Sequence, residues 1–187
     1  MPRTTLLLAD GFEEIETMTI VDVLRRADIS VALAGLDLEP KKGSHGVFVL
    51  PEISVDDIKS ENYQMLILPG GQPGTNHLMA DLRVLRLIRE FHQSNKYLAA
   101  ICAAPMVLAK AGVLGEKEAT CYPGCEKGLG QAKVLDKKVV QSNNIITSRG
   151  PATAFCFALL LVEILRDKAT ADQVGKGLLL PPTYCRE

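Results

Sequence analysis

The feature that most constrains the fold is a set of short segments that are apolar along their whole length. They are TTLLLA, SVALAGL, QMLILPGG and YLAAI. A strand with one solvated face alternates apolar and polar residues, so the missing alternation indicates strands buried on both faces. Helical patterns separate them, in EEIETMTIVDVLRRA, residues 74–94, AAPMVLAKAG and PATAFCFALLLVEILR. This order predicts an α/β fold, a doubly wound sandwich with a mostly parallel central sheet.

Further short strands are expected outside these segments. They are GVFVLP and, within residues 119–148, ATCY, AKVL, KVVQS and IITS. No repeat, low-complexity tract or Gly/Ser-rich linker divides the chain. A length of 187 residues fits one domain, so a single domain over residues 1–187 is expected.

Charge and hydrophobicity argue against several classes of partner. Lys and Arg total 21 against 22 Asp and Glu, so no specific nucleic-acid partner is expected. The apolar run Leu6–Ala9 is too short for a signal peptide or a membrane span, and the longest apolar stretch is interrupted by Glu163. The expectation is a soluble cytoplasmic protein that does not bind membranes.

The five cysteines do not suggest a structural role. Their odd number, the missing leader and a hydrophobic content of 47% argue against a disulfide framework. Cys121 and Cys125 are four residues apart, but no second pair or nearby histidine completes a zinc site, so no metal is expected. The remaining cysteines are Cys102, Cys156 and Cys185.

Cys102 follows the predicted strand YLAAI and precedes a helix. A nucleophile on such a sharp turn needs small neighbours, and here they are Ala99, Ala100, Ala103 and Ala104. The free N–H groups at a helix start favour an anion, so the thiol pKa is expected to be lowered. The alternative is a buried cysteine that packs as a small, inert hydrophobe.

Glu16 lies on the apolar face of the first predicted helix. It precedes Ile20, Val23 and Ala27 by four, seven and eleven residues, which places all four on one side. A buried carboxyl group is costly unless it is partnered or protonated, and such groups cluster at functional sites. The alternative is a frayed helix start from which Glu16 reaches solvent, as Glu13 and Glu14 are expected to do.

Two further turns are expected at the same edge of the sheet as Cys102 and Glu16. In sheets of this kind ligands bind at the carboxyl ends of the strands, so these turns are candidate parts of the site. In LPGGQPG, the backbone of Gly70 and Gly71, with the Ala103 amide, could hold an oxyanion. The alternative is an ordinary glycine turn, and no nucleotide-binding spacing is present.

Tyr122, in ATCYPGC, is either a hydrogen-bond donor at the site or a half-buried strand residue. Cys121 could form a disulfide with an oxidised Cys102.

Together these turns resemble the ThiJ/PfpI superfamily, and most closely its DJ-one branch, named for a Parkinson-associated protein. The resembling elements occur in the family's order over roughly residues 4 to 180. They are ADGFEEIET, VDVLRRA, LPGGQPG, AAICAAP and TSRGPATAFCFAL.

The resemblance implies a flavodoxin-like sandwich, a homodimer and a mechanism without a cofactor. It implies that Cys102 is the nucleophile and that Glu16 is a protonated acid donating a hydrogen bond to it. The amides of Gly71 and Ala103 would form the oxyanion site. Gly70 and Tyr122, from the turns described above, are candidate lining residues. Tyr122 replaces the family's common histidine, which argues against a Cys–His dyad and against protease activity.

Two functions are therefore expected, and one reactive thiolate serves both. The first is stress protection by a glyoxalase- or deglycase-type enzyme, acting on small carbonyl compounds or on glycated proteins and nucleotides. The second is a redox-sensing oxidative-stress protein or chaperone in which Cys102 is oxidised to a sulfinate. In a third, structural interpretation Cys102 is inert.

Overall fold

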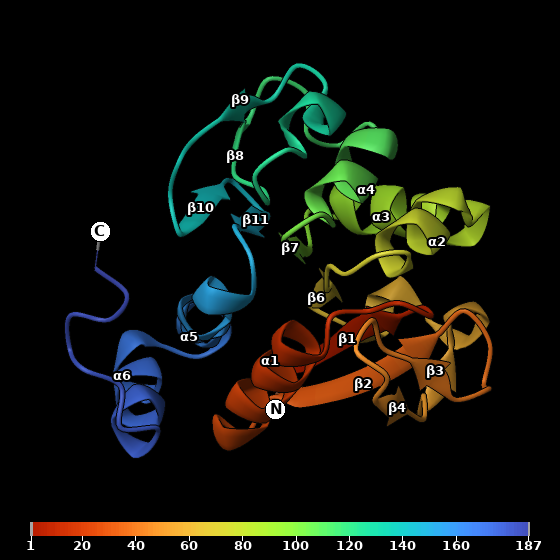
Figure 1. Cartoon of the computed structure of the whole chain (residues 1–187). Coiled ribbons are helices and arrows are strands. Elements are labelled where there is room, and N and C mark those ends of the chain that lie inside the picture. Colours follow the sequence, from red (N-terminus) through yellow and green to blue (C-terminus); the bar gives the residue numbers. More distant parts are fainter. Residues whose placement is uncertain (1, 187) are drawn as a thin grey trace.

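The computed structural model describes residues 2–186 and contains a central sheet covered by helices on both faces (Figure 1). Within these residues the main sheet has seven strands in the order β10-β11-β7-β6-β1-β2-β5. Every neighbouring pair is parallel except β10 and β11. The strands are β1 (Arg3–Leu8), β2 (Ser30–Gly35), β5 (Ile53–Ser54), β6 (Met65–Leu68), β7 (Tyr97–Ile101), β10 (Val139–Ser142) and β11 (Ile145–Ser148). The predicted α/β sandwich with a mostly parallel sheet is confirmed.

The helices form two layers. One layer contains α2 (Gly74–Ala80), α3 (Leu82–Gln93) and α4 (Pro105–Lys110). The other contains α1 (Glu14–Arg26), α5 (Ala154–Leu165) and α6 (Lys168–Gly177) (Figure 1). No helix within residues 2–186 combines the length and apolar content that a membrane span requires.

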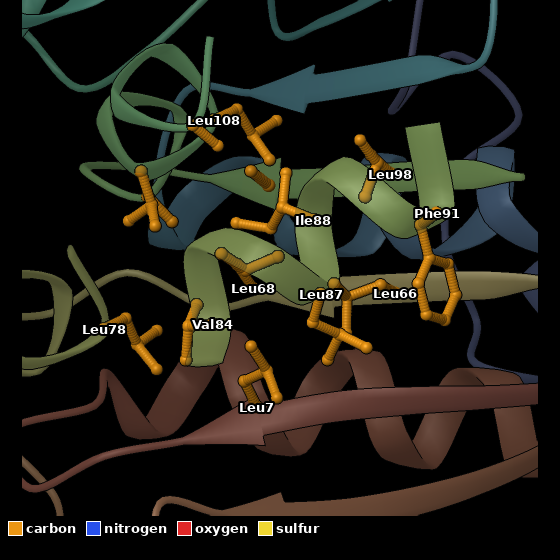
Figure 2. Packing of buried hydrophobic residues seen from close by; sticks show 14 of the residues in the cluster. Leu7, Leu66, Leu68, Leu78, Val84, Leu87, Ile88, Phe91, Leu98 and Leu108 are labelled. Atoms are coloured by element: carbon orange, nitrogen blue, oxygen red, sulfur yellow. The ribbon is translucent and has the colours of Figure 1, made fainter. Parts of the chain in front are cut away.

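The apolar strands are explained by burial on both faces. In β1, Leu7 packs into the core under α2, α3 and α4, whereas Leu6 and Leu8 pack into the core under α1, α5 and α6. Successive strand residues point to opposite faces, so a strand between two cores has no solvent-facing position, and the buried hydroxyls of Thr4 and Thr5 donate to carbonyls of β2. Figure 2 shows the first core, where Ile88 and Phe91 of α3 lie against strand leucines such as Leu66.

Several short strands differ from the expectation. In GVFVLP only β4 (Phe48–Val49) is extended, and it pairs with β3 (Lys41–Lys42) in a hairpin outside the main sheet. The ATCY and AKVL segments shrink to β8 (Glu118–Ala119) and β9 (Lys133–Val134), a small separate pair. Ala119, Thr120 and Cys121 are nevertheless buried, so the ATCY segment packs against the protein without joining the main sheet. The edge strand β5 and the helix α6 were not predicted.

The expectation against disulfides is wrong for one pair, because Cys156 in α5 is bonded to Cys185. The two cysteines are 29 residues apart, and α6 reverses the chain so that its end returns to the start of α5. The prediction failed because it did not include α6. Within the described residues Cys102, Cys121 and Cys125 are free thiols.

Candidate active site

Cys102 occupies a sharp turn between β7 and α4. Its φ angle is 64°, a left-handed conformation that non-glycine residues rarely adopt and that is concentrated at functional sites. Its backbone N–H donates to the Ser148 carbonyl (2.9 Å), and its carbonyl accepts from the Tyr122 N–H (2.8 Å). The neighbouring strand β11 therefore fixes the turn, and the side chain is 8% exposed. Ser148 was not singled out from the sequence because a backbone contact leaves no side-chain signal.

Glu16 lies in the first turn of α1 and is fully buried, as the helical pattern predicts. Its Oε2 accepts a hydrogen bond from the Gly70 N–H at 2.8 Å. The carboxyl group is also close enough to the Cys102 thiol for each to change the other's pKa. Among the described residues Oε1 has no hydrogen-bond partner, so it is the carboxyl oxygen free to carry a proton.

Burial raises the pKa of Glu16 from 4.5 to about 7. The Gly70 hydrogen bond opposes this rise, the charge of Glu13 adds to it, and the hydrogen bond with Cys102 opposes it. A carboxyl group with this pKa exists in both protonation states near neutral pH. It can therefore both donate and accept a proton.

The pKa of Cys102 does not follow the expectation. Burial, the charge of an ionised Glu16 and the hydrogen bond to Glu16 raise the thiol pKa, whereas the amides of Ala103 and Gly71 lower it. The predicted lowering by the helix start is outweighed, because α4 is only six residues long and the thiol is buried. The thiol and the carboxyl group thus form a coupled pair that disfavours double ionisation. When Glu16 holds the single proton of the pair, its O–H group and the amides of Ala103 and Gly71 would stabilise the Cys102 thiolate.

The glycine turn after β6 packs directly against the Cys102–Glu16 pair. A Cβ on Gly70 would lie 2.5 Å from the Cys102 Cβ and 2.9 Å from the Glu16 Oε2. Gly71 has a φ angle of 93°, and a Cβ there would meet the backbone of Phe12 and Glu13. The structure therefore brings Gly70, Gly71 and Ala103 together around the Cys102–Glu16 pair, where only residues without a side chain, or with a small one, fit.

We expect Gly70→Ala to push Cys102 away from Glu16, because the new methyl group overlaps both. Overpacking of this kind costs about 1–3 kcal/mol of unfolding free energy. Urea denaturation measures this loss, and the rate of Cys102 alkylation by iodoacetamide reports the displaced thiol. Gly177→Ala is the matched control, since a Cβ there meets no atom within 4 Å. Equal stability and alkylation in the two variants would contradict the tight contact.

The stability of the protein should depend on pH through Glu16. Between pH 4.5 and about 7 the folded state keeps a proton that the unfolded state has lost, so stability falls as pH rises. The contribution is fully present below pH 4.5 and lost above about 7, an effect of about 3 kcal/mol. Urea denaturation at several pH values measures it. In the Glu16→Gln variant this change of unfolding free energy with pH should be absent. A variant whose unfolding free energy varies with pH as in the parent would contradict the raised pKa of Glu16.

Glu13 and Glu14 do not point to solvent as expected. The Glu13 side chain is buried and its Oε2 accepts from the Glu16 N–H at 2.7 Å, which caps α1. Glu14 accepts from the backbone N–H groups of His45 and Val47 and binds the His45 ring. Burial opposes these bonds, but together they lower the pKa of Glu14 to about 2. The helix start is therefore fastened to the β3–β4 hairpin rather than frayed.

The contact between the start of α1 and the β3–β4 hairpin also brings possible metal ligands close together. Glu13, Glu14 and His45 place one ligand atom each within 4.8 Å of one another. Glu14 and His45 are already hydrogen-bonded partners, at 3.0 Å. Their arrangement is accounted for by the fastening of the hairpin.

Tyr122 lies in a turn after β8, not on a strand, and it is 48% exposed. Its ring faces Gly150, where an added Cβ would lie 3.2 Å from the ring. It thus stands at the edge of the site, next to the Cys102 backbone. Apart from burial, the groups that shift the pKa of Cys102 most are Glu16 and the amides of Ala103 and Gly71. Glu16 is consequently the proton carrier that the site offers.

Cys121 is poorly placed to react with Cys102. Cys121 packs into the core under α2, α3 and α4, whereas Cys102 packs into the core on the other side of the sheet. The pKa of Cys121 is raised to about 11 by burial and by Cys125 and Glu126, with Cys102 not among the causes. The structure does not bring these two thiols together.

The candidate site is nearly closed to solvent, because Glu16 is fully buried and Cys102 almost so. A hollow of about 380 Å³ is lined by other residues, namely Ala9, Asp10, Leu36, Asp37, Lys41, His77, Ala80 and Asp81. Neither Cys102 nor Glu16 lines this hollow. With a thiol that is 8% exposed, the site suits a reagent of a few atoms.

Comparison with known proteins agrees with this architecture. Residues 2–164 match the DJ-1/PfpI family. The protein dj-1beta of Drosophila melanogaster is 43% identical over 178 residues, which cover 94% of this chain and 95% of that protein. Its crystal structure superposes with a TM-score of 0.93 at 42% identity, covering 96% and 98% of the two chains.

Two further relatives carry informative names. The glutathione-independent glyoxalase DJR-1.2 of Caenorhabditis elegans is 36% identical over 176 residues, which cover 94% of each chain. The structure of oxidized Toxoplasma gondii DJ-1 has a TM-score of 0.91 at 32% identity and covers 96% of this chain and 99% of that one. On the family match and these identities, this chain belongs to the DJ-1/PfpI family.

Proposed function

We propose that this protein is a cofactor-independent glyoxalase that converts small reactive glyoxals to hydroxyacids. The observation that carries the proposal is the Cys102 thiol next to a buried carboxyl group whose pKa is about 7. The name of the Caenorhabditis elegans relative supports the same chemistry. The nearly closed site favours a substrate the size of methylglyoxal.

The chemistry uses one nucleophile and one proton carrier. The Cys102 thiolate adds to the aldehyde carbon, and the resulting oxyanion, placed near the amides of Gly71 and Ala103, takes the Glu16 proton to give a hemithioacetal. The Glu16 carboxylate then removes the proton from the former aldehyde carbon to give an enediolate and returns it to the neighbouring carbon, while the hydroxyl proton moves from the first oxygen to the second. The product is a thioester, and water cleaves it to the hydroxyacid and the free thiol.

Lactate formation from methylglyoxal, with no glutathione added, tests the proposal. Purified protein should produce lactate, and prior alkylation with iodoacetamide should stop the reaction. Turnover no faster than that of the alkylated protein would overturn it. Early glyoxal adducts of proteins and nucleotides are the second substrate class to assay, and they would have to approach past the exposed Tyr122.

Redox sensing is the alternative function, and the oxidized state of the Toxoplasma gondii relative favours it. A protonated Glu16 could donate a hydrogen bond to a Cys102 sulfinate. Peptide mass mapping after mild peroxide treatment should then find oxidation concentrated at Cys102. Equal oxidation of the free cysteines would contradict this role, and the associated chaperone activity has no specific support in the site.

We also infer a homodimer. Exposed apolar side chains gather on the outer face of α1 and on the hairpin that Glu14 fastens to it, namely Ile15, Met18, Val47, Phe48 and Leu50. Light scattering would distinguish a dimer from a monomer. A cytoplasmic location stays a prediction from the sequence.

A further inference from the structure

The C-terminal tail, residues 179–186, returns to the body of the protein after α6. Leu179 adopts a φ angle of 60°, which helps to reverse the chain. The tail then runs beside the start of α5, and in Figure 1 the C-terminal end lies on the side of α5, α6 and β10. Cys185 on this tail is bonded to Cys156 of α5.

The other contacts of the tail are few and mostly at the surface. Lys138 donates from Nζ to the carbonyls of Tyr184 (2.8 Å) and Arg186 (2.9 Å). The Tyr184 ring meets Phe155 edge-on at 6.4 Å. Exposed hydrogen bonds of this kind each contribute about 1 kcal/mol or less. Leu179 is 88% exposed, so the tail has no apolar anchor there. The disulfide is therefore the main connection between the C-terminal tail and the rest of the protein.

The tail is attached close to the candidate active site. The Tyr184 hydroxyl donates to the Ala152 carbonyl at 3.4 Å, in the turn formed by residues 149–153. At the other end of this turn, Ser148 accepts from the Cys102 N–H, and Gly150 faces the Tyr122 ring. The turn thus connects the tail to the backbone that positions Cys102.

The two bonded cysteines differ in exposure, and this favours reversible opening. Cys156 is 5% exposed, whereas Cys185 lies in an exposed segment. A thiol in solution can therefore reach the Cys185 sulfur, and exposed disulfides are the labile ones.

We propose that Cys156 and Cys185 form a second redox site, a reversible disulfide that fastens the C-terminal tail to the turn beside the Cys102 site. A small thiol attacks the Cys185 sulfur, the sulfur–sulfur bond breaks, and Cys156 leaves as a thiolate that takes up a proton. A second small thiol then attacks the mixed disulfide, which frees Cys185 and gives the small disulfide. Two electrons pass to the protein, and a small disulfide reverses both steps.

The test is a redox titration in defined mixtures of glutathione and glutathione disulfide, using a Cys102→Ser background. This background removes oxidation at the candidate nucleophile, so the result is independent of the proposed glyoxalase activity. After alkylation, mass spectrometry should find the Cys156–Cys185 bond in oxidising mixtures and two alkylated thiols in reducing ones. Cysteines that stay linked in every mixture, or that never link, would overturn the proposal.

Hydrogen exchange tests the mechanical consequence. Reduction should increase amide exchange by about tenfold or more in residues 179–186 and also raise it in the turn of residues 149–153. Cys185→Ser should reproduce this increase without reductant, and reductant should then have no further effect. Cys125→Ser, which alters a half-buried thiol outside the tail, is the matched control and should behave as the parent. Unchanged exchange on reduction would show that the disulfide does not fasten the tail.

Discussion

Cys102→Ser should abolish lactate formation from methylglyoxal, with a loss of at least about a thousandfold. A serine hydroxyl is a far weaker nucleophile than a thiolate, and the titratable side chain that acts most on this position is the Glu16 carboxyl group, not a histidine. The fold should be retained, because serine is close to cysteine in size and the turn is held by backbone bonds to Ser148 and Tyr122. Lactate production and urea denaturation, measured side by side, check both statements.

Cys125→Ser provides the control for the loss of a thiol. Cys125 is a free, half-buried cysteine just before the 3-10 turn Glu126–Leu129 and is not part of the candidate site. This variant should retain full turnover. Substantial activity in Cys102→Ser would mean that another residue attacks the substrate, and the proposed function would then have to be moved to a different site.

Glu16→Gln should lower turnover by about a hundredfold or more while leaving Cys102 open to alkylation. The amide oxygen of glutamine can still accept from the Gly70 N–H, and its NH₂ group can donate to the sulfur. It cannot, however, move a proton between the two carbons of the substrate. Lactate production reports the lost proton transfer, and the iodoacetamide reaction reports the surviving thiol.

Glu13→Gln is the matched control, because it changes the neighbouring carboxyl group and retains an oxygen to cap the Glu16 N–H. Its main effect should be a lower Glu16 pKa, visible as a shifted pH profile with turnover retained. If Glu16→Gln kept normal turnover, the proton-transfer role would be wrong even with Cys102 as nucleophile.

The sheet and the buried acid could be predicted from short-range patterns. Leucines in β1 without alternation indicate two cores, and the spacing of Glu16 from Ile20 and Val23 places its carboxyl group on the buried face. Both features depend only on strand and helix periodicity. The three strand-end turns also converge as the parallel topology requires.

Features that depend on distant contacts could not be predicted in this way. Glu14 is held by the hairpin about 31 residues away, and Cys156 is bonded to a cysteine that α6 carries back to it. The raised pKa of Cys102 depends on how completely the loops exclude water. The position of Cys102 at a helix start indicates an effect that lowers the thiol pKa. It does not indicate the burial that raises the same pKa.

The hydrogen bond from Cys102 to Ser148 has a consequence for synthesis of the protein. The candidate nucleophile directly follows β7, yet its turn is completed by Ser148 at the end of β11, 46 residues later in the chain. On the ribosome, a nascent chain ending before residue 148 would carry an ordinary thiol without its turn. The reactive centre would therefore arise late in translation, after most of the chain has emerged.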